Sequence, residues 1–278
     1  MNFKICALQC SLKDSETENL LKIEKFAREA KEKFDPHLLV LPELFQGPYF
    51  CKTEDENFFS TARSPENSES VHRIKKLAQE LKLAINISFF EESHEAYYNS
   101  QVLAYSDGSL SDVYRKLHIP DGPGYEEKFY FRPGNQGFKV WDVQGVKIGA
   151  AICWDQWYPE MSRSLTLLGA DVIIYPTAIG SEPETPELNT KDSWQTVMRG
   201  QSVANAVTIV AANRVGDEGG QVFYGSSFIS SHTGSKIVEA NEEEETILFA
   251  EIDVKAQKQY RASFGFFRDR RSDVYINE

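Results

Sequence analysis

The stretch VKIGAAICWDQWYPE (146–160) joins an apolar run to a segment with the signals of a helix start. Its first part, VKIGAAIC (146–153), has the length and composition of a buried strand, and the part that follows favours a helix. Cys153 is therefore expected on a sharp strand-to-helix turn. There a main-chain N–H can point at a reacting atom, and a helix N-terminus can favour a thiolate. We interpret Cys153 as a candidate nucleophile.

Strands and helices alternate on both sides of this stretch. Apolar runs predict strands at 3–9, 37–43, 83–92, 170–177, 207–214 and 245–254. Amphipathic segments predict helices at 16–33, 66–82, 158–168 and 191–206. Turn signals predict hairpins over 99–117 and 223–240, and the remaining long segments are predicted loops at 48–63, 118–138 and 180–188. Two apolar sheets with helices on their outer faces explain this order best, which indicates the α/β class.

The chain is predicted to form a single domain over residues 1–278. Nothing in it resembles a linker, a low-complexity stretch or a solenoid repeat. The final segment, 255–278, is charged and aromatic, and we expect it to be an arm at an oligomer interface. Packing of the same segment on its own core is the alternative.

Composition narrows the function classes. The formal net charge is −12 and no basic patch is visible, which argues against nucleic acid as a partner. No apolar run approaches the ~20 residues that span a membrane, and the N-terminus lacks a secretory pattern. The four cysteines form no CxxC pair, so we expect reduced thiols in a cytoplasmic protein with no structural metal. No cofactor is expected, because no nucleotide-binding motif or His pair at ligand spacing occurs.

Three polar residues follow apolar strands at matching places: Glu43, Lys116 and Cys153. Side chains at strand ends gather at one rim of a sheet, where α/β proteins place their sites. A glutamate can accept the thiol proton, and a lysine can stabilise an oxyanion. Each residue also has a structural explanation, as a helix cap, a solvated strand end and a buried thiol. Spacing alone leaves both interpretations open.

The chain resembles the nitrilase, or carbon–nitrogen hydrolase, superfamily. The similarity lies in LPELF (41–45), YRKLHIP (114–120) and AICWDQWYPE (151–160), in that order. Each of these motifs holds one member of that superfamily's Glu-Lys-Cys triad, and the similarity extends over nearly the whole chain. It implies a four-layer α-β-β-α sandwich, in which two sheets pack face to face between layers of helices.

The resemblance also implies roles. Cys153 would be the nucleophile, Glu43 the general base and Lys116 the stabiliser of the tetrahedral intermediate. The main-chain N–H of Trp154 would complete the oxyanion site.

A second glutamate usually follows the lysine in this superfamily. In GYEEKFYF (124–131) that position falls on Glu127, with Glu126 as the neighbour that could be confused with it. Its implied task is to position Lys116. A solvated acidic pair in a loop is the alternative.

Within the superfamily the sequence is most similar to N-carbamoylputrescine amidases of polyamine biosynthesis. The similar segments are 45–51, 118–140, 153–160 and 175–183. The similarity implies a small cationic ureido substrate and a homo-oligomer. β-Ureidopropionases, D-carbamoylases and ω-amidases remain alternatives, as does a non-catalytic binding protein.

An extended substrate with an ammonium group at its far end needs a carboxylate there and an apolar sleeve between. Glu182 is the predicted carboxylate, and Glu184 and Glu187 are the fallbacks. An ordinary solvated loop acid is the alternative for Glu182. A β-ureido acid would instead need a cation such as Arg132. The predicted sleeve is formed by Tyr125, Tyr130, Phe131 and Trp154.

A rival chemistry uses a Cys-His pair of papain type. His118 is the one histidine beside the predicted centre, and it would have to contact Cys153. In that case Lys116 would be a bystander.

Overall fold

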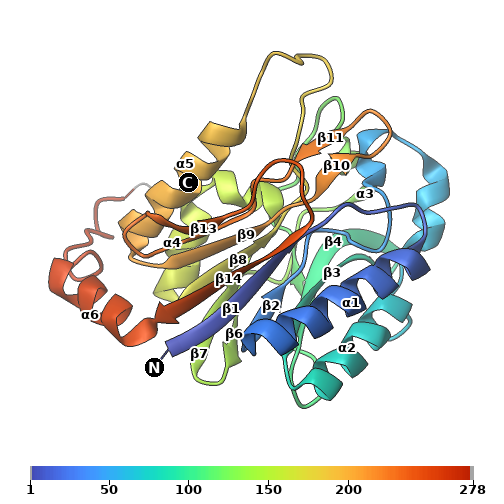
Figure 1. Ribbon diagram of the computed structural model, residues 1–278. Coiled ribbons are helices and arrows are strands. Elements are labelled where there is room, and N and C mark those ends of the chain that lie inside the picture. The colour runs from blue at the N-terminus through green and yellow to red at the C-terminus, as the bar shows by residue number, and fades with distance from the viewer. Residues whose placement is uncertain (1, 276–278) are drawn as a thin grey trace.

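Two six-stranded sheets face each other in the computed structural model, which describes residues 2–275 (Figure 1). The first sheet has the order β14-β1-β2-β3-β4-β5. Its strands are β1 (Asn2–Gln9), β2 (Leu38–Val40), β3 (Ala84–Ser93), β4 (Ala96–Ala104), β5 (Tyr114–Arg115) and β14 (Thr246–Asp253). The second sheet has the order β13-β12-β9-β8-β7-β6. Its strands are β6 (Lys139–Val143), β7 (Val146–Ala150), β8 (Val172–Pro176), β9 (Thr208–Ala212), β12 (Phe228–Ser230) and β13 (Lys236–Glu239).

Helices cover the outer face of each sheet. The helices α1 (Glu16–Phe34) and α2 (Glu69–Leu81) pack on the first sheet, and α4 (Pro159–Leu167) and α5 (Lys191–Asn205) pack on the second (Figure 1). Smaller elements are α3 (Glu127–Tyr130), α6 (Val254–Phe264) and the two-stranded ribbon of β10 (Val215–Asp217) and β11 (Val222–Tyr224). Three 3₁₀-helices are η1 (Phe50–Lys52), η2 (Glu56–Thr61) and η3 (Cys153–Trp157). The predicted α-β-β-α sandwich is confirmed.

Local sequence explains why the elements form where they do. In α1 the Ser15 hydroxyl accepts a hydrogen bond from the N–H of Glu18, and a left-handed Asp35 just before Pro36 ends the helix. One face of α1 is buried against the first sheet. Inner-face side chains of both sheets, such as Ile5 and Ile148, share one core cluster. Burial on both faces explains the continuous apolar runs of these strands.

The two sheets meet at one rim. The N–H of Glu43, just beyond β2, donates to the carbonyl of Thr177, just beyond β8, at 3.4 Å. The strand ends that carry the predicted triad are therefore close in space, although they belong to different sheets.

Several boundaries differ from the predictions. The hairpin that pairs β3 with β4 turns at His94 and Glu95, which both have positive φ and carry no Gly or Pro signal. The predicted strand over 223–230 is split between β11 and β12, because Gly225 and Ser226 both take left-handed backbone. Strand β6 was not predicted.

The predicted arm over 255–278 contains helix α6, and its last residues, 276–278, lie outside the described ones. Arg261 of α6 donates to the carbonyls of Ala170 and Ala206 at 3.2 and 3.0 Å. The guanidinium of Arg163 in α4 lies 4.8 Å from the ring of Phe267. The arm therefore packs on its own chain, and its contact with a partner stays a prediction.

None of the helices within residues 2–275 has the length and apolar character to cross a membrane.

Candidate active site

Cys153 lies on the sharp turn that the sequence predicts, directly after the extended Ile152 that follows β7. Its φ is +37°, a left-handed conformation that is costly for a residue with a Cβ. The helix that begins at the thiol is a 3₁₀-helix, η3, and the helix predicted over 158–168 is α4, which begins at Pro159. The proline restrains Tyr158 to an extended backbone, which separates the two helices.

The turn is fastened by Asp155, a fully buried residue that sequence reasoning missed. One carboxylate oxygen accepts the N–H of Ile152 at 2.9 Å and the hydroxyl of Tyr114 at 2.6 Å. The other accepts the main-chain N–H of His118 at 3.1 Å and lies 2.7 Å from its ring Nδ1. Asp155 thereby ties the turn of Cys153 to the segment that carries Lys116.

These contacts also bear on the Cys-His hypothesis. The ring of His118 is held by Asp155 and stacks on Tyr158, with ring centroids 3.7 Å apart. No hydrogen bond joins His118 to Cys153 among residues 2–275, and the thiol instead lies 3.8 Å from the carbonyl of Ala178. The geometry favours the Glu-Lys-Cys alternative.

The main chain of Lys116 is fixed on both sides. Its N–H donates to the carbonyl of Asn99, and its carbonyl accepts from Gly134, both at 2.8 Å. A Cβ at position 134 would lie 2.2 Å from the carbonyl oxygen of Arg115, so only glycine fits this approach.

The ammonium of Lys116 is the centre of a buried charge cluster. Nζ lies 2.9 Å from Oε1 of Glu43 and 2.9 and 2.6 Å from the two carboxylate oxygens of Glu127. The three side chains are at most 1% exposed. Burial alone would lower the pKa of Lys116, but the charges of Glu127 and Glu43 raise it well above its usual range. The ammonium therefore stays charged.

The two oxygens of Glu43 have different surroundings. Oε1 accepts hydrogen bonds from Lys116 and, at 2.7 Å, from the side-chain amide of Asn99. Oε2 is buried and has no hydrogen-bond partner within residues 2–275. A buried carboxylate oxygen without a donor is rare, and this one is free to accept a proton.

Glu127 begins the short helix α3 and is buried, so the alternative of a solvated acidic pair does not hold for it. Burial raises its pKa to about 6, although Lys116 and the hydroxyl of Tyr49 act in the opposite direction. That hydroxyl donates to Oε1 of Glu127 at 2.7 Å. The neighbouring Glu126 is half-buried, and its N–H donates to the carbonyl of Cys51.

The thiol of Cys153 belongs to the same cluster. Burial and the charge of Glu43 raise its pKa well above the usual range, while Lys116 lowers it. Cys153 is therefore a neutral thiol at rest, which differs from the thiolate that a helix N-terminus would favour. A neutral thiol needs a base at the moment of attack, and Oε2 of Glu43 is available for that task.

Two residues predicted for substrate contact, Trp154 and Tyr125, lie near the thiol. Trp154 is the second residue of η3, so its N–H is among the donors that have no partner inside the helix. The hydroxyl of Tyr125 accepts from the N–H of Gly180 at 2.9 Å, which ties the loop after β8 to the loop of Glu127. Burial raises the pKa of Tyr125, and Glu182 and the ionised form of Cys153 add to the rise.

The same two charges also raise the pKa of Tyr224, after burial as the main cause. Glu182 and Cys153 therefore both act on the same two phenols, Tyr125 and Tyr224. Glu182 itself is half-buried, and burial raises its pKa.

Tyr130 and Phe131 occupy a different place. The hydroxyl of Tyr130 donates to the carbonyl of Thr53 at 2.6 Å and accepts from the N–H of Asp55 at 2.8 Å. Both rings belong to an aromatic cluster around Phe50. The aromatic region considered below is formed by Tyr125 and Tyr224 instead.

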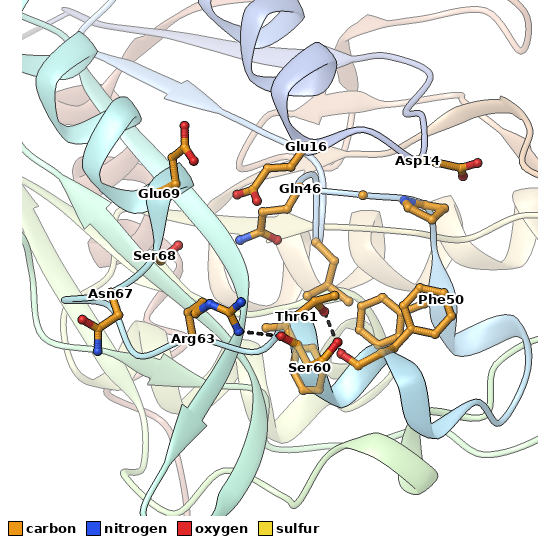
Figure 2. Close-up of a pocket in the computed structure, with 15 residues that line it drawn as sticks. Asp14, Glu16, Gln46, Phe50, Ser60, Thr61, Arg63, Asn67, Ser68 and Glu69 are labelled. Atoms are coloured by element: carbon orange, nitrogen blue, oxygen red, sulfur yellow. Dashed lines mark hydrogen bonds between the residues drawn. The ribbon is translucent and has the colours of Figure 1, made fainter.

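A separate pocket of about 540 Å³ borders the segment that follows Glu43 (Figure 2). Its lining includes Leu44, Gln46, Pro48, Phe50 and Arg63. None of the residues predicted for catalysis or substrate contact lines this pocket. The predicted site and this pocket are therefore different places on the molecule.

No group of three or more metal-ligating side chains occurs within the described part of the chain, residues 2–275.

Comparison with known proteins agrees with this geometry. The sequence profile of the carbon-nitrogen hydrolase family matches residues 4–262. The chain is 46% identical to an N-carbamoylputrescine amidase of Arabidopsis thaliana, over 98% of this chain and 93% of that protein. It is 45% identical to a citrullinase of Francisella tularensis, over 99% and 97%. A crystal structure of a carbon-nitrogen hydrolase from Helicobacter pylori G27 matches with a TM-score of 0.91 at 36% identity, covering 99% of this chain and 97% of that one. The chain therefore belongs to the carbon-nitrogen hydrolase family.

Proposed function

We propose that the protein hydrolyses the terminal ureido group of N-carbamoylputrescine to putrescine, carbon dioxide and ammonia. The observation that carries the proposal is the buried cluster of Glu43, Lys116 and Glu127 beside the thiol of Cys153. It combines a nucleophile, a free carboxylate oxygen and a fixed positive charge, which are the groups that acyl transfer needs.

The first half of the reaction forms a thioester. Sγ of Cys153 attacks the ureido carbon while its proton passes to Oε2 of Glu43. Lys116 and the main-chain N–H of Trp154 stabilise the oxyanion. When the intermediate collapses, the bond to the terminal nitrogen breaks, Glu43 returns the proton to that nitrogen, and ammonia leaves.

The second half consumes the thioester. Glu43 removes a proton from water as the water oxygen attacks the carbonyl carbon, and collapse breaks the bond from that carbon to Sγ of Cys153. The proton held by Glu43 returns to the sulfur. The carbamate that is released loses carbon dioxide to leave the free amine.

The far end of the substrate is assigned to Glu182. The loop SEPETPELNT (181–190) carries three glutamates and no lysine or arginine, so it suits an ammonium group better than a carboxylate. Tyr125 and Tyr224, whose pKa values respond to both Glu182 and the ionisation of Cys153, supply the aromatic region between the two ends.

Citrulline is the second candidate substrate. It has the same ureido end, and a relative at 45% identity is named a citrullinase. Its far end carries a carboxylate as well as an ammonium group, and the acidic loop would repel that carboxylate.

A substrate panel tests the proposal. Ammonia release is measured with N-carbamoylputrescine, citrulline, N-carbamoyl-β-alanine and an ω-amide. The expected result is the highest kcat/KM for N-carbamoylputrescine. A higher kcat/KM for citrulline would show that citrulline is the substrate, and the proposed ureido hydrolysis would still hold. No turnover of any ureido compound contradicts the proposed function.

A further inference from the structure

A buried ion pair lies behind Glu43 and belongs to none of the predicted motifs. Arg214 stands between β9 and β10 and is fully buried, and Glu218, just after β10, is 8% exposed. Nη1 of Arg214 lies 2.9 and 2.8 Å from the two carboxylate oxygens of Glu218. This pair leaves other N–H groups of the guanidinium and other lone pairs of the carboxylate free to bond further partners.

The guanidinium is directed at the main chain that carries Glu43. Its Nε and Nη2 donate to the carbonyl of Glu43 at 3.2 and 3.0 Å. Nη2 also donates to the carbonyl of Leu44 at 2.7 Å, and Nη1 donates to that of Gly47 at 3.1 Å. Leu44 has a φ of +47°, a conformation that persists only where its surroundings enforce it. Arg214 therefore fixes the backbone from which the Glu43 side chain leaves.

The carboxylate of Glu218 reaches the other glutamate. Its Oε2 accepts the main-chain N–H of Tyr49 at 2.7 Å. Tyr49 is fully buried, and its hydroxyl donates to Oε1 of Glu127 at 2.7 Å. Glu127 in turn binds the ammonium of Lys116.

We propose that the Arg214–Glu218 pair is a positioning device that sets Glu43 and Glu127 relative to each other across Nζ of Lys116. One partner holds the main chain of the base, and the other holds the tyrosine that orients the second carboxylate. Catalytic geometry tolerates errors of only about 0.5 Å, so a shared anchor matters for rate. The inference rests on the proposed function for its turnover readout only.

The decisive variant is Arg214→Lys. Lysine keeps a positive charge beside Glu218 but cannot donate to three carbonyl groups and a carboxylate at once. We expect kcat to fall about 100-fold on the fastest substrate of the panel, with KM within about 3-fold of the parent value. Alkylation of Cys153 by iodoacetamide, which also needs Glu43 as base, should slow at least about 10-fold.

The matched control is Arg73→Lys. Arg73 donates twice to Glu24 in an ion pair that joins α1 and α2, away from the charge cluster. This variant should keep both kcat and the alkylation rate. Thermal unfolding of both variants and titration of active thiols give kcat per folded site.

A second variant, Tyr49→Phe, removes only the hydroxyl that bonds Glu127 and keeps the ring in place. The tyrosine hydroxyl lowers the pKa of Glu127, so its removal should raise that pKa. The acid limb of the pH–rate profile should then move above pH 6, with kcat reduced about 10-fold. A merely structural role for this residue would leave the limb where it is.

Two results overturn the proposal. One is an Arg214→Lys protein whose kcat per titrated thiol and alkylation rate match the parent values. If Arg214→Lys does not fold, Tyr49→Phe decides, and an unmoved acid limb overturns the proposal. Failure of the whole substrate panel contradicts the proposed function alone, because the pH dependence and rate of Cys153 alkylation still test the positioning device.

Discussion

The charge cluster around Lys116 and the acidic loop 181–190 place carboxylates in opposite ways. Glu43 and Glu127 are completely enclosed, and both bond the same ammonium. Glu182 is half-buried in a loop whose side chains are mostly exposed. Burial raises the pKa of both Glu127 and Glu182, but only Glu127 has a buried cation within hydrogen-bond distance to oppose the rise.

The difference has a physical cause. A buried charge that loses its partner costs several kcal/mol, so the members of the cluster must be present together. A half-exposed acid is solvated without a partner, so it can be exchanged without loss of the fold. We call the buried cluster with Cys153 the reaction end of the site and the loop of Glu182 the substrate end. We therefore expect substitutions at the reaction end to lower both the rate and the stability of the protein. Substitutions at the substrate end should change substrate binding without loss of the fold.

The strongest test of the reaction end is Cys153→Ser. The hydroxyl has a much higher pKa than a thiol, so Glu43 cannot deprotonate it at the same rate, and kcat should fall roughly 10⁴-fold or more. The substitution removes little volume, so thermal unfolding should change little. Ammonia release and calorimetry measure the two effects. The control is Cys6→Ala. Cys6 lies in the core between the first sheet and α1, so this variant should keep the kcat of the parent protein.

Removal of the cation should affect rate and stability together. Lys116→Met keeps an apolar stem of similar length but leaves two buried carboxylates without a counter-charge. We expect kcat to fall about 100- to 1,000-fold and the free energy of unfolding to fall by about 3–5 kcal/mol. The exposed pair of Lys147 and Asp142 is the control, and Lys147→Met should cost under about 1 kcal/mol. Equal losses for both variants would contradict the distinction between the two regions.

Glu127→Gln removes the charge of the side chain but keeps its shape, so it tests the charge alone. In the parent protein the carboxyl protonates as pH falls through about 6, and Lys116 then loses one of its two counter-charges. The activity of the parent should therefore fall below pH 6, and the variant should lose about 100-fold in kcat and lack this limb.

The same ionisation has a stability signature. The folded protein holds the Glu127 proton up to about pH 6, whereas the ordinary pKa is 4.5. Between these values the folded state binds more protons than the unfolded state, so stability falls as pH rises through this window. The variant should lack that fall, and denaturant titrations at pH 4.5 and 6.5 measure it. An identical slope in both proteins would show that Glu127 does not titrate there.

The sequence points to Glu43, Lys116 and Cys153 because each of these residues follows a strand. Apolar runs mark the strands, and one polar residue follows each of them, as with Glu43 after β2 and Lys116 after β5. Parallel strand ends meet at one rim, so local patterns are sufficient to bring these residues together.

Contacts between residues that are far apart in the sequence could not be predicted in the same way. Arg214 contacts the carbonyl of Glu43, which is 171 positions away, and Asp155 contacts Tyr114 across 41 positions. Neither contact leaves a periodic pattern. Tyr130 shows a related difficulty: a buried phenol suits a substrate sleeve or a structural hydrogen bond equally well, and the sequence does not reveal the bond of its hydroxyl to Thr53.

The smallest expected effect concerns the substrate end. Glu182→Gln should raise KM for N-carbamoylputrescine about 10-fold and leave kcat unchanged, because one charge-assisted hydrogen bond at a partly solvated site is lost. An uncharged ureido substrate such as butylurea should show no change, and added salt should narrow the difference. Glu187→Gln in the same loop is the matched control and should keep the parent KM. If the two variants raise KM equally, the loop acts on the substrate through its summed charge. In that case the contrast with the buried cluster is sharper still, because no single carboxylate of the loop has a fixed partner.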